Sequence, residues 1–403
     1  MASDPVGHGP LRGLRVLDLG QVIAGPFAAT LLADFGADVI KIEPPHEQDP
    51  MRGMVPLKNG TSVWWKSLGR NKRCITLNLK SPRGRELFLE LCRMSDVVIE
   101  NFRPGVLEQL GLAWETLHEV NPNLILLRIS GYGQTGPYRD RPGFGRVAEA
   151  FSGAQYITGE PDRAPMTSGY SLVDMVSGLM GAYAVMLALH ARQTHGAGGQ
   201  VIDLGLYESL FRLVDFPVPI YDQLGVIVER LGNGHPTAAP INTYRTRDGR
   251  WVTVSAPTDR AARRLLEAIG GTELASDPRF LTNESRVKHR ESLDALIRQW
   301  FADHTFDEVQ ACFETSGVAY SKVYSAADIA ADAHYAAREN IVEMPDEEFG
   351  SVRIPGVVPK LLGTPGAIRW TGPRKGEHNE EVYSGLLGLS PADLEELRQK
   401  GVI

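Results

Sequence analysis

The first half of the chain alternates short runs of aliphatic and β-branched residues with stretches of helical length. These runs are residues 14–20, 38–43, 74–79, 96–102, 124–133 and 200–211. Nearly every position in them is apolar, as expected of parallel strands that helices cover on both faces. Between them we expect a helix at 25–36 and another that begins after Ser81, a suitable N-cap, with Pro82 at its first position. The alternation predicts an open α/β sheet built from βαβ units.

The alternation stops in the second half, where a different unit begins. Its first strands form a predicted hairpin with the turn at Asp248-Gly249, and charged amphipathic helices such as 285–304 follow. The chain ends in a predicted helix at 390–401, with Ser390 as N-cap and Pro391 at the first helical position. We therefore predict a large domain, a linker, a small domain, and a return linker with the C-terminal part of the large domain. These segments are 1–212, 213–239, 240–325 and 326–403.

The composition excludes several classes of protein. The 403 residues carry a net charge of −7 and no basic cluster on the scale of a nucleic-acid-binding surface. Cys74, Cys92 and Cys312 lack metal-ligand spacing, and the ten histidines are scattered, so we expect neither a disulfide framework nor a metal site. The apolar stretch 175–191 is short and rich in Gly and Ala, which favours a buried helix over a membrane span. Because MASDPVGHGP shows no targeting pattern, we expect a cytoplasmic protein without nucleic-acid or membrane partners.

Three loops at the predicted carboxyl ends of strands are candidate binding sites, because α/β sheets bind ligands there. The first loop, GQVIAGP (residues 20–26), precedes a helix whose free N–H groups could bind an anion. It lacks the Lys-Ser/Thr of a phosphate-binding loop. A tight turn that binds no ligand is therefore an equal alternative. NFRPG offers an amide, an aromatic ring and a guanidinium on Asn101, Phe102 and Arg103, or is simply a turn. The loop 130–144 is too long and glycine-rich for a plain connection.

Asp174 lies near the start of a long apolar helix predicted over 168–192, and two interpretations of it stay open. Ser171-Leu-Val-Asp174 matches a capping box, in which the acid reaches back to a backbone N–H. Alternatively, the helix macrodipole favours an ionised carboxylate, which can act as the nucleophile of acyl transfer. Positions 174, 177, 178 and 181 share one face of small residues, which would admit a thin ligand beside the carboxylate. The opposite face, which we expect to be core, contains Met175, Val176, Leu179, Met180 and Tyr183.

Three ordered segments and the Asp174 helix resemble the class III coenzyme A transferases, the CaiB/BaiF family, over essentially the whole chain. The segments are LRGLRVLDLGQVIAGPFAATLLADFGADVIKIEPP, GRNKRCITLNLKSPRGRELFLELCRMSDVVIENFRPGVLEQLGL and ISGYGQTGPYRDRPGF. The resemblance implies a Rossmann-like open parallel sheet in a discontinuous large domain and a smaller, inserted α+β domain. It also implies an interlocked homodimer.

The resemblance also implies the activity and its residues. Asp174 matches the family's catalytic aspartate, which carries acyl-anhydride and CoA-thioester intermediates. CoA and acyl-CoA are then substrates, and no cofactor is permanently bound. Among the reactions of the family, the resemblance suggests succinyl-CoA as the CoA donor and a dicarboxylic acid as the acceptor. The implied CoA contacts are Gln21, Val22, Ile23, Ala24, Leu77, Asn78, Leu79, Lys80, Asn101, Phe102 and Arg103, with the N–H groups of the first four as candidate oxyanion donors.

The chain departs from the family pattern at several places. Pro44-Pro45 and Gln109 stand where basic residues often occur, and Gly145 stands where an acid is common. We therefore expect the CoA phosphates to be held elsewhere, with Arg52, Arg73 and Arg103 as candidates. In the loop 230–240, the residues that match the acceptor-binding position of dicarboxylate-type members are Gly232, Gly234 and His235.

Two alternatives within the resemblance remain. A CoA-thioester racemase would need a base at the position of Gly143-Phe144-Gly145, and none is present. A non-catalytic acyl-CoA-binding subunit, or a partner in a heteromeric enzyme, would not need Asp174, which this chain keeps. Retention of the aspartate favours the transferase.

Overall fold

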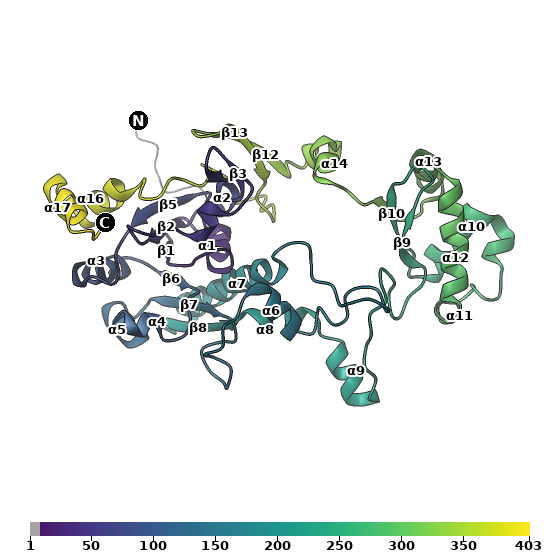
Figure 1. The fold of residues 1–403 in the computed structure, drawn as a ribbon, viewed down its shortest axis with the longest axis horizontal. Helices are drawn as coiled ribbons and strands as arrows, with labels where there is room; N and C mark the ends of the chain where they lie inside the picture. Colours follow the sequence, from purple (N-terminus) through teal and green to yellow (C-terminus); the bar gives the residue numbers. More distant parts are fainter. Residues whose placement is uncertain (1–8) are drawn as a thin grey trace. The chain divides into compact units, whose positions relative to one another are not determined.

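The protein contains a six-stranded parallel sheet, and its computed structural model describes residues 9–403 (Figure 1). The predicted α/β sheet is thus confirmed. The predicted last strand, 200–211, is wrong in its second half: the strand ends at Gly205 and helix α8 (Leu206–Leu213) follows, because Glu208 accepts a hydrogen bond from the Gly205 N–H at 2.6 Å. Most of the N-terminal stretch inspected for a targeting pattern, residues 1–8, lies outside the described residues. The strands are β1 (Arg15–Asp18), β2 (Asp38–Glu43), β5 (Lys72–Thr76), β6 (Val97–Glu100), β7 (Ile125–Ser130) and β8 (Gln200–Gly205).

The order of the strands, β5-β2-β1-β6-β7-β8, changes direction between β1 and β6. Val16 of β1 pairs with Val39 of β2 on one side and with Val97 of β6 on the other. The chain therefore leaves these two neighbouring strands toward opposite edges of the sheet. Such a switch point opens a crevice at the carboxyl ends of the strands, which is where open α/β sheets bind ligands.

Helices cover both faces of the sheet, as the apolar strands require. Alternate strand residues point to opposite sides: Val39 packs in one cluster and Ile40 in the other. Helices α1 (Ala24–Asp34) and α7 (Leu172–His195) cover the first face. The second face is covered by α3 (Pro82–Arg93) and α5 (Trp114–Val120), and also by α16 (Asn379–Leu387) and α17 (Pro391–Gln399) from the C-terminus. The large domain is therefore completed by the end of the chain.

Helix α7 presents to the core the opposite face from the one expected. Gly178 lies against the Ala24 carbonyl oxygen and Phe27, and Gly181 lies against Leu127, so the stripe of small residues allows helices and sheet to pack closely. Leu179 and Tyr183, which we expected in the core, are 57% and 59% exposed. The expected ligand passage along the stripe is therefore wrong. By length and composition alone α7 could cross a bilayer, but its buried side is core packing of this domain.

By contacts, the chain forms two compact units, and the second comprises residues 155–166 and 217–333. Its three antiparallel strands pack with helices around their own core. The predicted hairpin forms, with Gly249 at φ 84° in its turn, whereas the predicted helix 285–304 is broken at His289. The elements are α9 (Pro217–Leu224), β9 (Ile241–Arg245), β10 (Trp251–Ser255), α10 (Asp259–Ala275), α11 (Asn283–Lys288), α12 (Arg290–Asp303), α13 (Phe306–Ser316), β11 (Tyr320–Lys322) and α14 (Ala326–Ala331).

This grouping differs from the segments predicted from the sequence in three ways. The predicted linker contains helix α9, residues 155–166 pack with the second unit, and the return to the first unit comes at His334. The loop-rich return also contains an unexpected hairpin of β12 (Ile341–Asp346) and β13 (Gly350–Pro355). Smaller elements of the first unit are a 3-10 turn (Pro50–Gly53), β3 (Leu57–Lys58), β4 (Thr61–Ser62), α2 (Val63–Leu68), α4 (Val106–Gln109) and α6 (Gly145–Phe151). The division between the two units falls within α15 (Ala333–Ala337).

Candidate active site

A cavity of about 770 Å³ opens at the carboxyl ends of β1, β6 and β7, next to the switch point of the sheet. All of its lining residues belong to the first unit. Two of the three loops singled out from the sequence line it in part: residues 21–24 after β1 and the turn after β6. The third loop, after β7, contributes its two ends, and the first turn of α7 brings Asp174. The parallel topology thus gathers four segments that are far apart in the sequence.

Asp174 lies in the first turn of α7, with its carboxylate against the backbone of Gly145. A Cβ atom built on Gly145 would lie only 2.3 Å from Oδ2 of Asp174. The predicted capping box does not form: the N-cap Ser171 makes no side-chain hydrogen bond, and its ψ of 61° departs from the extended backbone of a usual N-cap. No Lys, Arg or His among residues 9–403 forms an ion pair with Asp174. The carboxylate therefore lines the cavity and takes no part in a capping box with Ser171.

Burial raises the pKa of Asp174 to about 6, and the hydrogen bond from its own backbone N–H lowers it by less. We expected the position at a helix N-terminus to favour the anion, but desolvation outweighs that stabilisation here. At neutral pH the group is still mostly ionised. It is thus a partly desolvated carboxylate with no ion-pair partner in the described part of the chain, which is a reactive form.

Side chains from other segments hold the loop after β1 by hydrogen bonds to some of its backbone N–H and carbonyl groups. The Gln21 N–H donates to Asn101 Oδ1 at 2.7 Å, and Asn101 Nδ2 donates back to the Gln21 carbonyl at 2.8 Å. The Val22 N–H donates to Asp49 at 3.0 Å. Gln21 and Val22 are therefore not the oxyanion donors we expected. No described residue accepts from the N–H groups of Ile23 and Ala24, which line the cavity at the start of α1.

The turn after β6 is also partly committed to the fold. The side-chain amide of Asn101 is hydrogen-bonded to the backbone N–H and carbonyl of Gln21, and the Phe102 N–H donates to Glu100 at 2.6 Å. Arg103 is exposed, and no described side chain forms an ion pair with it. Of this predicted trio, Arg103 keeps its polar groups available for a ligand.

The glycine-rich loop after β7 supplies cationic groups that the sequence analysis did not single out. The Cα atoms of Gly131 and Gly143 approach so closely that a Cβ on either would meet the other at 2.7–2.8 Å, which folds the loop back over the end of its strand. Between them, Arg139 and Arg141 line the cavity, and Arg141 lies 3.5 Å over the Tyr138 ring. A motif search misses them because an arginine in a loop has no distinctive spacing.

Ser130 at the end of β7 is a further unpredicted lining residue. It is 5% exposed, and its Oγ has no hydrogen-bond partner in the described structure. Arg146 also lines the cavity and donates to the Thr167 hydroxyl. An unpaired buried hydroxyl in a cavity wall is suited to bind a substrate oxygen.

Several predicted site residues lie outside the cavity. In the segment after β5, Leu77 is buried, the Asn78 N–H donates to the Val402 carbonyl at 2.8 Å, and Asn78 Oδ1 accepts from the Lys80 N–H at 3.1 Å. Leu79 packs against the second core cluster. Asn78 thus ties the C-terminal segment to the end of β5. The contact of all four residues with CoA stays a prediction.

Two of the arginines proposed for the CoA phosphates are structural. Arg52 is buried, pairs with Glu43 at 2.6 Å and stacks over the Trp65 ring at 4.0 Å. Arg73 is buried and pairs with Asp38 at 2.6 Å. Since both guanidinium groups are already satisfied by carboxylates inside the protein, the expectation that they hold phosphates is wrong.

The predicted acceptor-binding residues lie in the second unit. The Gly232 N–H donates to the Gly159 carbonyl at 2.9 Å, and the Gly234 N–H donates to the Leu231 carbonyl at 3.0 Å. His235 Nδ1 accepts from the Thr237 N–H at 3.3 Å. The bonds of Gly234 and His235 form a local turn, and the bond of Gly232 ties this turn to the segment 155–166, which belongs to the same unit. The role of these residues in acceptor binding stays a prediction. Within residues 9–403, no group of three His, Cys, Asp or Glu side chains could hold a metal ion.

A model of CoA-transferase family III matches residues 11–379. The chain belongs to this family. It is therefore an enzyme of the transferase class, one that moves CoA between an acyl-CoA and a carboxylic acid. This agrees with the CaiB/BaiF resemblance stated from the sequence, and CoA thioesters are its substrates.

Relatives match over nearly the full length of the transferase. It is 46% identical over 396 residues to the succinyl-CoA–D-citramalate CoA-transferase of Chloroflexus aurantiacus, covering 98% of each chain. The beta subunit of the succinyl-CoA–L-malate CoA-transferase of that bacterium is 45% identical over 399 residues, again covering 98% of each. Mouse succinyl-CoA:glutarate CoA-transferase is 32% identical, covering 100% of this chain and 92% of the mouse protein. The crystal structure of a CaiB/BaiF family protein from Brucella suis matches with a TM-score of 0.84 at 32% identity, covering 94% of this chain and 100% of that one.

Proposed function

We propose that this enzyme transfers CoA from succinyl-CoA to a dicarboxylic acid through covalent intermediates on Asp174. The observation that carries the proposal is the Asp174 carboxylate, which lies in the cavity without a cationic partner among the described residues. With a pKa of about 6, it is ionised at neutral pH yet partly stripped of water. A solvated or ion-paired carboxylate would be a poorer nucleophile.

The proposed reaction has four steps, which balance without an added proton. An oxygen of Asp174 attacks the thioester carbonyl and the C–S bond breaks. The products are free CoA thiolate and a mixed anhydride between Asp174 and the succinyl group. The thiolate then attacks the Asp174 carbonyl carbon, which releases succinate and leaves an aspartyl-CoA thioester. The acceptor carboxylate attacks this thioester to form a second anhydride and CoA thiolate. The thiolate finally attacks the acceptor acyl carbon, giving the new acyl-CoA and free Asp174.

Each intermediate in this sequence is an anhydride or a thioester, so the energy of the donor thioester is kept and no nucleotide is needed. Each step passes through a tetrahedral oxyanion, which requires hydrogen-bond donors placed before the reaction. The free N–H groups of Ile23 and Ala24 and the Ser130 hydroxyl line the same cavity as Asp174. We propose these three groups as the donors.

The cationic lining of the cavity suits the phosphates of CoA. Arg103, Arg139 and Arg141 line its wall, whereas Arg52 and Arg73 are consumed by internal ion pairs. Guanidinium groups bind phosphate through paired, charge-assisted hydrogen bonds. We propose that Arg103 and Arg141 make these contacts, since Arg139 already pairs with Asp140 at 3.3 Å.

The proposed acceptor is a substituted succinic acid. The relatives with 46% and 45% identity are named for D-citramalate and L-malate, which are both hydroxylated succinic acids, and for succinyl-CoA as donor. Gly232, Gly234 and His235 remain our proposal for the acceptor contact.

A trapping experiment tests this function. The purified protein is incubated with succinyl-CoA, quenched with borohydride or hydroxylamine, and the peptide of residues 168–192 is examined by mass spectrometry. We expect a donor-dependent modification of Asp174 that is absent from Asp174→Asn, and CoA transfer to malate or citramalate in preference to glutarate. Failure of every donor to modify Asp174, together with exchange of the α-proton of a 2-methylacyl-CoA, would instead support a racemase.

The exposed apolar side of α7 supports the proposed homodimer. Leu179, Tyr183 and Leu187 lie more than half exposed on one helix, which is unusual for a surface that faces water. Because related malate transferases have alpha and beta subunits, a related chain is the alternative partner. Light scattering of the purified chain distinguishes a dimer from a monomer that awaits a second subunit.

A further inference from the structure

The cavity loop of residues 20–26 rests on a set of buried charged side chains. The Gly20 N–H donates to Asp18 at 2.9 Å, and Lys41 donates to the Gly20 carbonyl. Lys72 donates to the Pro26 carbonyl at 2.7 Å and pairs with Asp18 at 2.8 Å. Asp18, Lys41 and Lys72 are 0% exposed and come from three neighbouring strands. Burying such pairs contributes little net stability compared with apolar packing, so their concentration behind one loop calls for another explanation.

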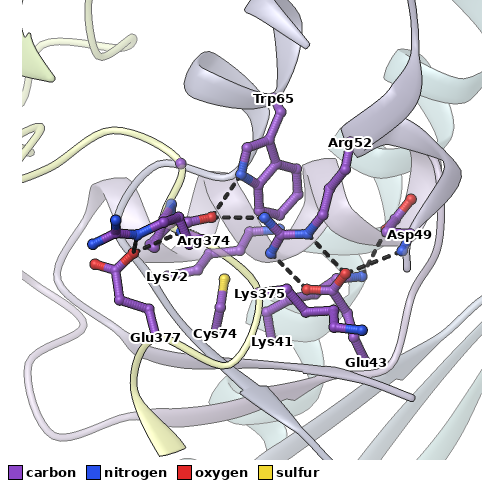
Figure 2. Close-up of polar contacts among 12 residues, drawn as sticks. Lys41, Glu43, Asp49, Arg52, Trp65, Lys72, Cys74, Arg374, Lys375 and Glu377 are labelled. Atoms are coloured by element: carbon purple, nitrogen blue, oxygen red, sulfur yellow. Dashed lines mark hydrogen bonds and ion pairs between the residues drawn. The ribbon is translucent and has the colours of Figure 1, made fainter. Parts of the chain in front are cut away.

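Asp49 is the member of this set that reaches the middle of the loop. It is 2% exposed, and its Oδ1 accepts from the Val22 N–H at 3.0 Å and from the Met51 N–H at 2.9 Å. Its Oδ2 pairs with Lys41 at 2.9 Å, and its own N–H donates to Glu43 at 3.0 Å. Figure 2 shows Lys41, Glu43 and Asp49 gathered together beside Arg52. Burial acts to raise the pKa of Asp49, but Lys41 and the two N–H groups outweigh it and lower the pKa.

Val22 has an unusual backbone conformation for its side chain. Its φ is 62°, in the left-handed region, where a β-branched residue is strained by about 1–3 kcal/mol. Its N–H bond to Asp49 opposes relaxation to a negative φ, which would rotate the peptide groups on either side. The next peptide groups are those of Ile23 and Ala24, which line the cavity with Asp174.

We propose that Asp49, oriented by Lys41, is a positioning residue that holds Val22 in its left-handed conformation and so places the Ile23 and Ala24 N–H groups for the reaction. Asp49 itself is not among the residues that line the cavity. The proposal rests on the proposed function, because it takes this cavity as the place where acyl transfer occurs. Its content is separate: it concerns how the loop acquires its shape, not what Asp174 does.

The test compares two enzymes that lack the buried ion pair and differ only in the side-chain acceptor at position 49, which serves the Val22 and Met51 N–H groups. Removing one charge alone would leave the other buried and unpaired, which costs several kcal/mol and endangers folding. The Lys41→Met/Asp49→Asn enzyme keeps an oxygen for the Val22 N–H, whereas Lys41→Met/Asp49→Leu has similar size and none. We expect kcat of the leucine enzyme to be lower by about 10- to 100-fold, with the KM for succinyl-CoA changed much less.

A matched control and a rescue separate positioning from stability. Asp34 and Arg70 form another buried pair, at 2.6 Å, that makes no hydrogen bond to residues 20–26. Arg70→Met combined with Asp34→Asn or with Asp34→Leu should lower the melting temperature without separating the two kcat values. Adding Val22→Gly to the leucine enzyme should restore at least part of the lost kcat, because glycine adopts a positive φ without strain.

Several outcomes would overturn the proposal. Equal kcat values for the asparagine and leucine enzymes would show that the side-chain oxygen at position 49 does not contribute to catalysis. Failure of Val22→Gly to restore kcat would show that the backbone strain at Val22 does not cause the loss. Borohydride trapping on Asp174 in the unaltered enzyme tests the proposed function independently. Amide hydrogen exchange of the peptide that contains Val22, Ile23 and Ala24 adds a readout without Asp174 chemistry. If trapping fails in the unaltered enzyme, equal exchange of this peptide in the asparagine and leucine enzymes still refutes a role of Asp49 in holding the loop.

Discussion

Replacing Gly145 by alanine should disturb catalysis while leaving the fold intact. The alanine Cβ would lie 2.3 Å from Oδ2 of Asp174, a separation that non-bonded atoms do not tolerate. Either the carboxylate or the first turn of α6 must give way. The Asp174 side chain can rotate, whereas α6 is tied back through the hydrogen bond from the Ala148 N–H to the Phe144 carbonyl at 3.0 Å. The nucleophile is therefore the group that moves.

The size of both effects follows from this geometry. The carboxylate oxygen must retreat by roughly 0.7 Å before the contact becomes acceptable. Misplacement of a reacting atom by nearly 1 Å can reduce a rate by about 10²-fold, so we expect kcat to fall by about 10- to 100-fold. The backbone of Gly145 is not in the left-handed region, so alanine should fit and stabilise the protein slightly, by about 0.4–1 kcal/mol, through the unfolded chain.

Single-turnover trapping and thermal melting measure the two effects separately. The rate of Asp174 acylation by succinyl-CoA is followed by quench and mass spectrometry, and the melting temperature by calorimetry. Gly169→Ala is the matched control, because Gly169 lines the same cavity but its Cβ would meet nothing within 4 Å. Acylation of Gly145→Ala within about threefold of the unaltered enzyme would refute the reasoning, since it would mean that the reactive carboxylate does not lie against Gly145.

Three further predictions concern Asp174 and the cavity arginines. The acylation rate should fall as the pH drops through about 6, because only the ionised carboxylate attacks, and a rate independent of pH between 5 and 8 would contradict this. Asp174→Asn should be inactive, yet its free energy of unfolding at pH 7 should be higher by roughly 3 kcal/mol at most. The pKa of Asp174 is raised in the folded protein, so ionisation of its carboxyl group destabilises the fold. This destabilisation is complete above pH 6 and absent below the ordinary pKa of 3.8. The advantage of Asp174→Asn in melting temperature should therefore vanish as the pH falls toward 4, and a constant advantage would exclude the titration as its cause. Arg141→Ala should raise the KM for succinyl-CoA about tenfold with little change in kcat, unlike the same change at the surface residue Arg83, and equal effects of the two would refute phosphate binding.

Local features of the fold were predictable because the residues that cause them are neighbours. The strand 38–43 is observed with those bounds, and Ser81 and Ser390 cap their helices by accepting from the N–H groups of Gly84 and Asp393. A strand pattern and a cap each depend on a few successive residues. The predicted capping box at Asp174 fails for the same kind of reason, because the backbone of Ser171 is turned away from the conformation that a cap needs.

The face that α7 buries could not be predicted from its sequence. Both sides of the helix are poor in charge, and the side of small residues, rather than the side with Leu179 and Tyr183, packs against α1 and β7. Small residues are buried here because they let backbones approach closely, a requirement set by the neighbouring elements. Hydrophobicity alone would have chosen the opposite side.

The sequence by itself determined the alternation of strands and helices, the loops at the strand ends and the prominence of Asp174, since each is written in a short stretch of residues. Only the tertiary structure decided which groups in those loops are available. Asn101 is hydrogen-bonded to the backbone of Gln21, 80 positions away in the chain. Asp49 accepts from the Val22 N–H, 27 positions away, and Glu43 forms an ion pair with Arg52 inside the protein. Hydrogen bonds and ion pairs between distant segments form only once the parallel strands bring their carboxyl ends together, so the availability of each group is a property of the folded chain.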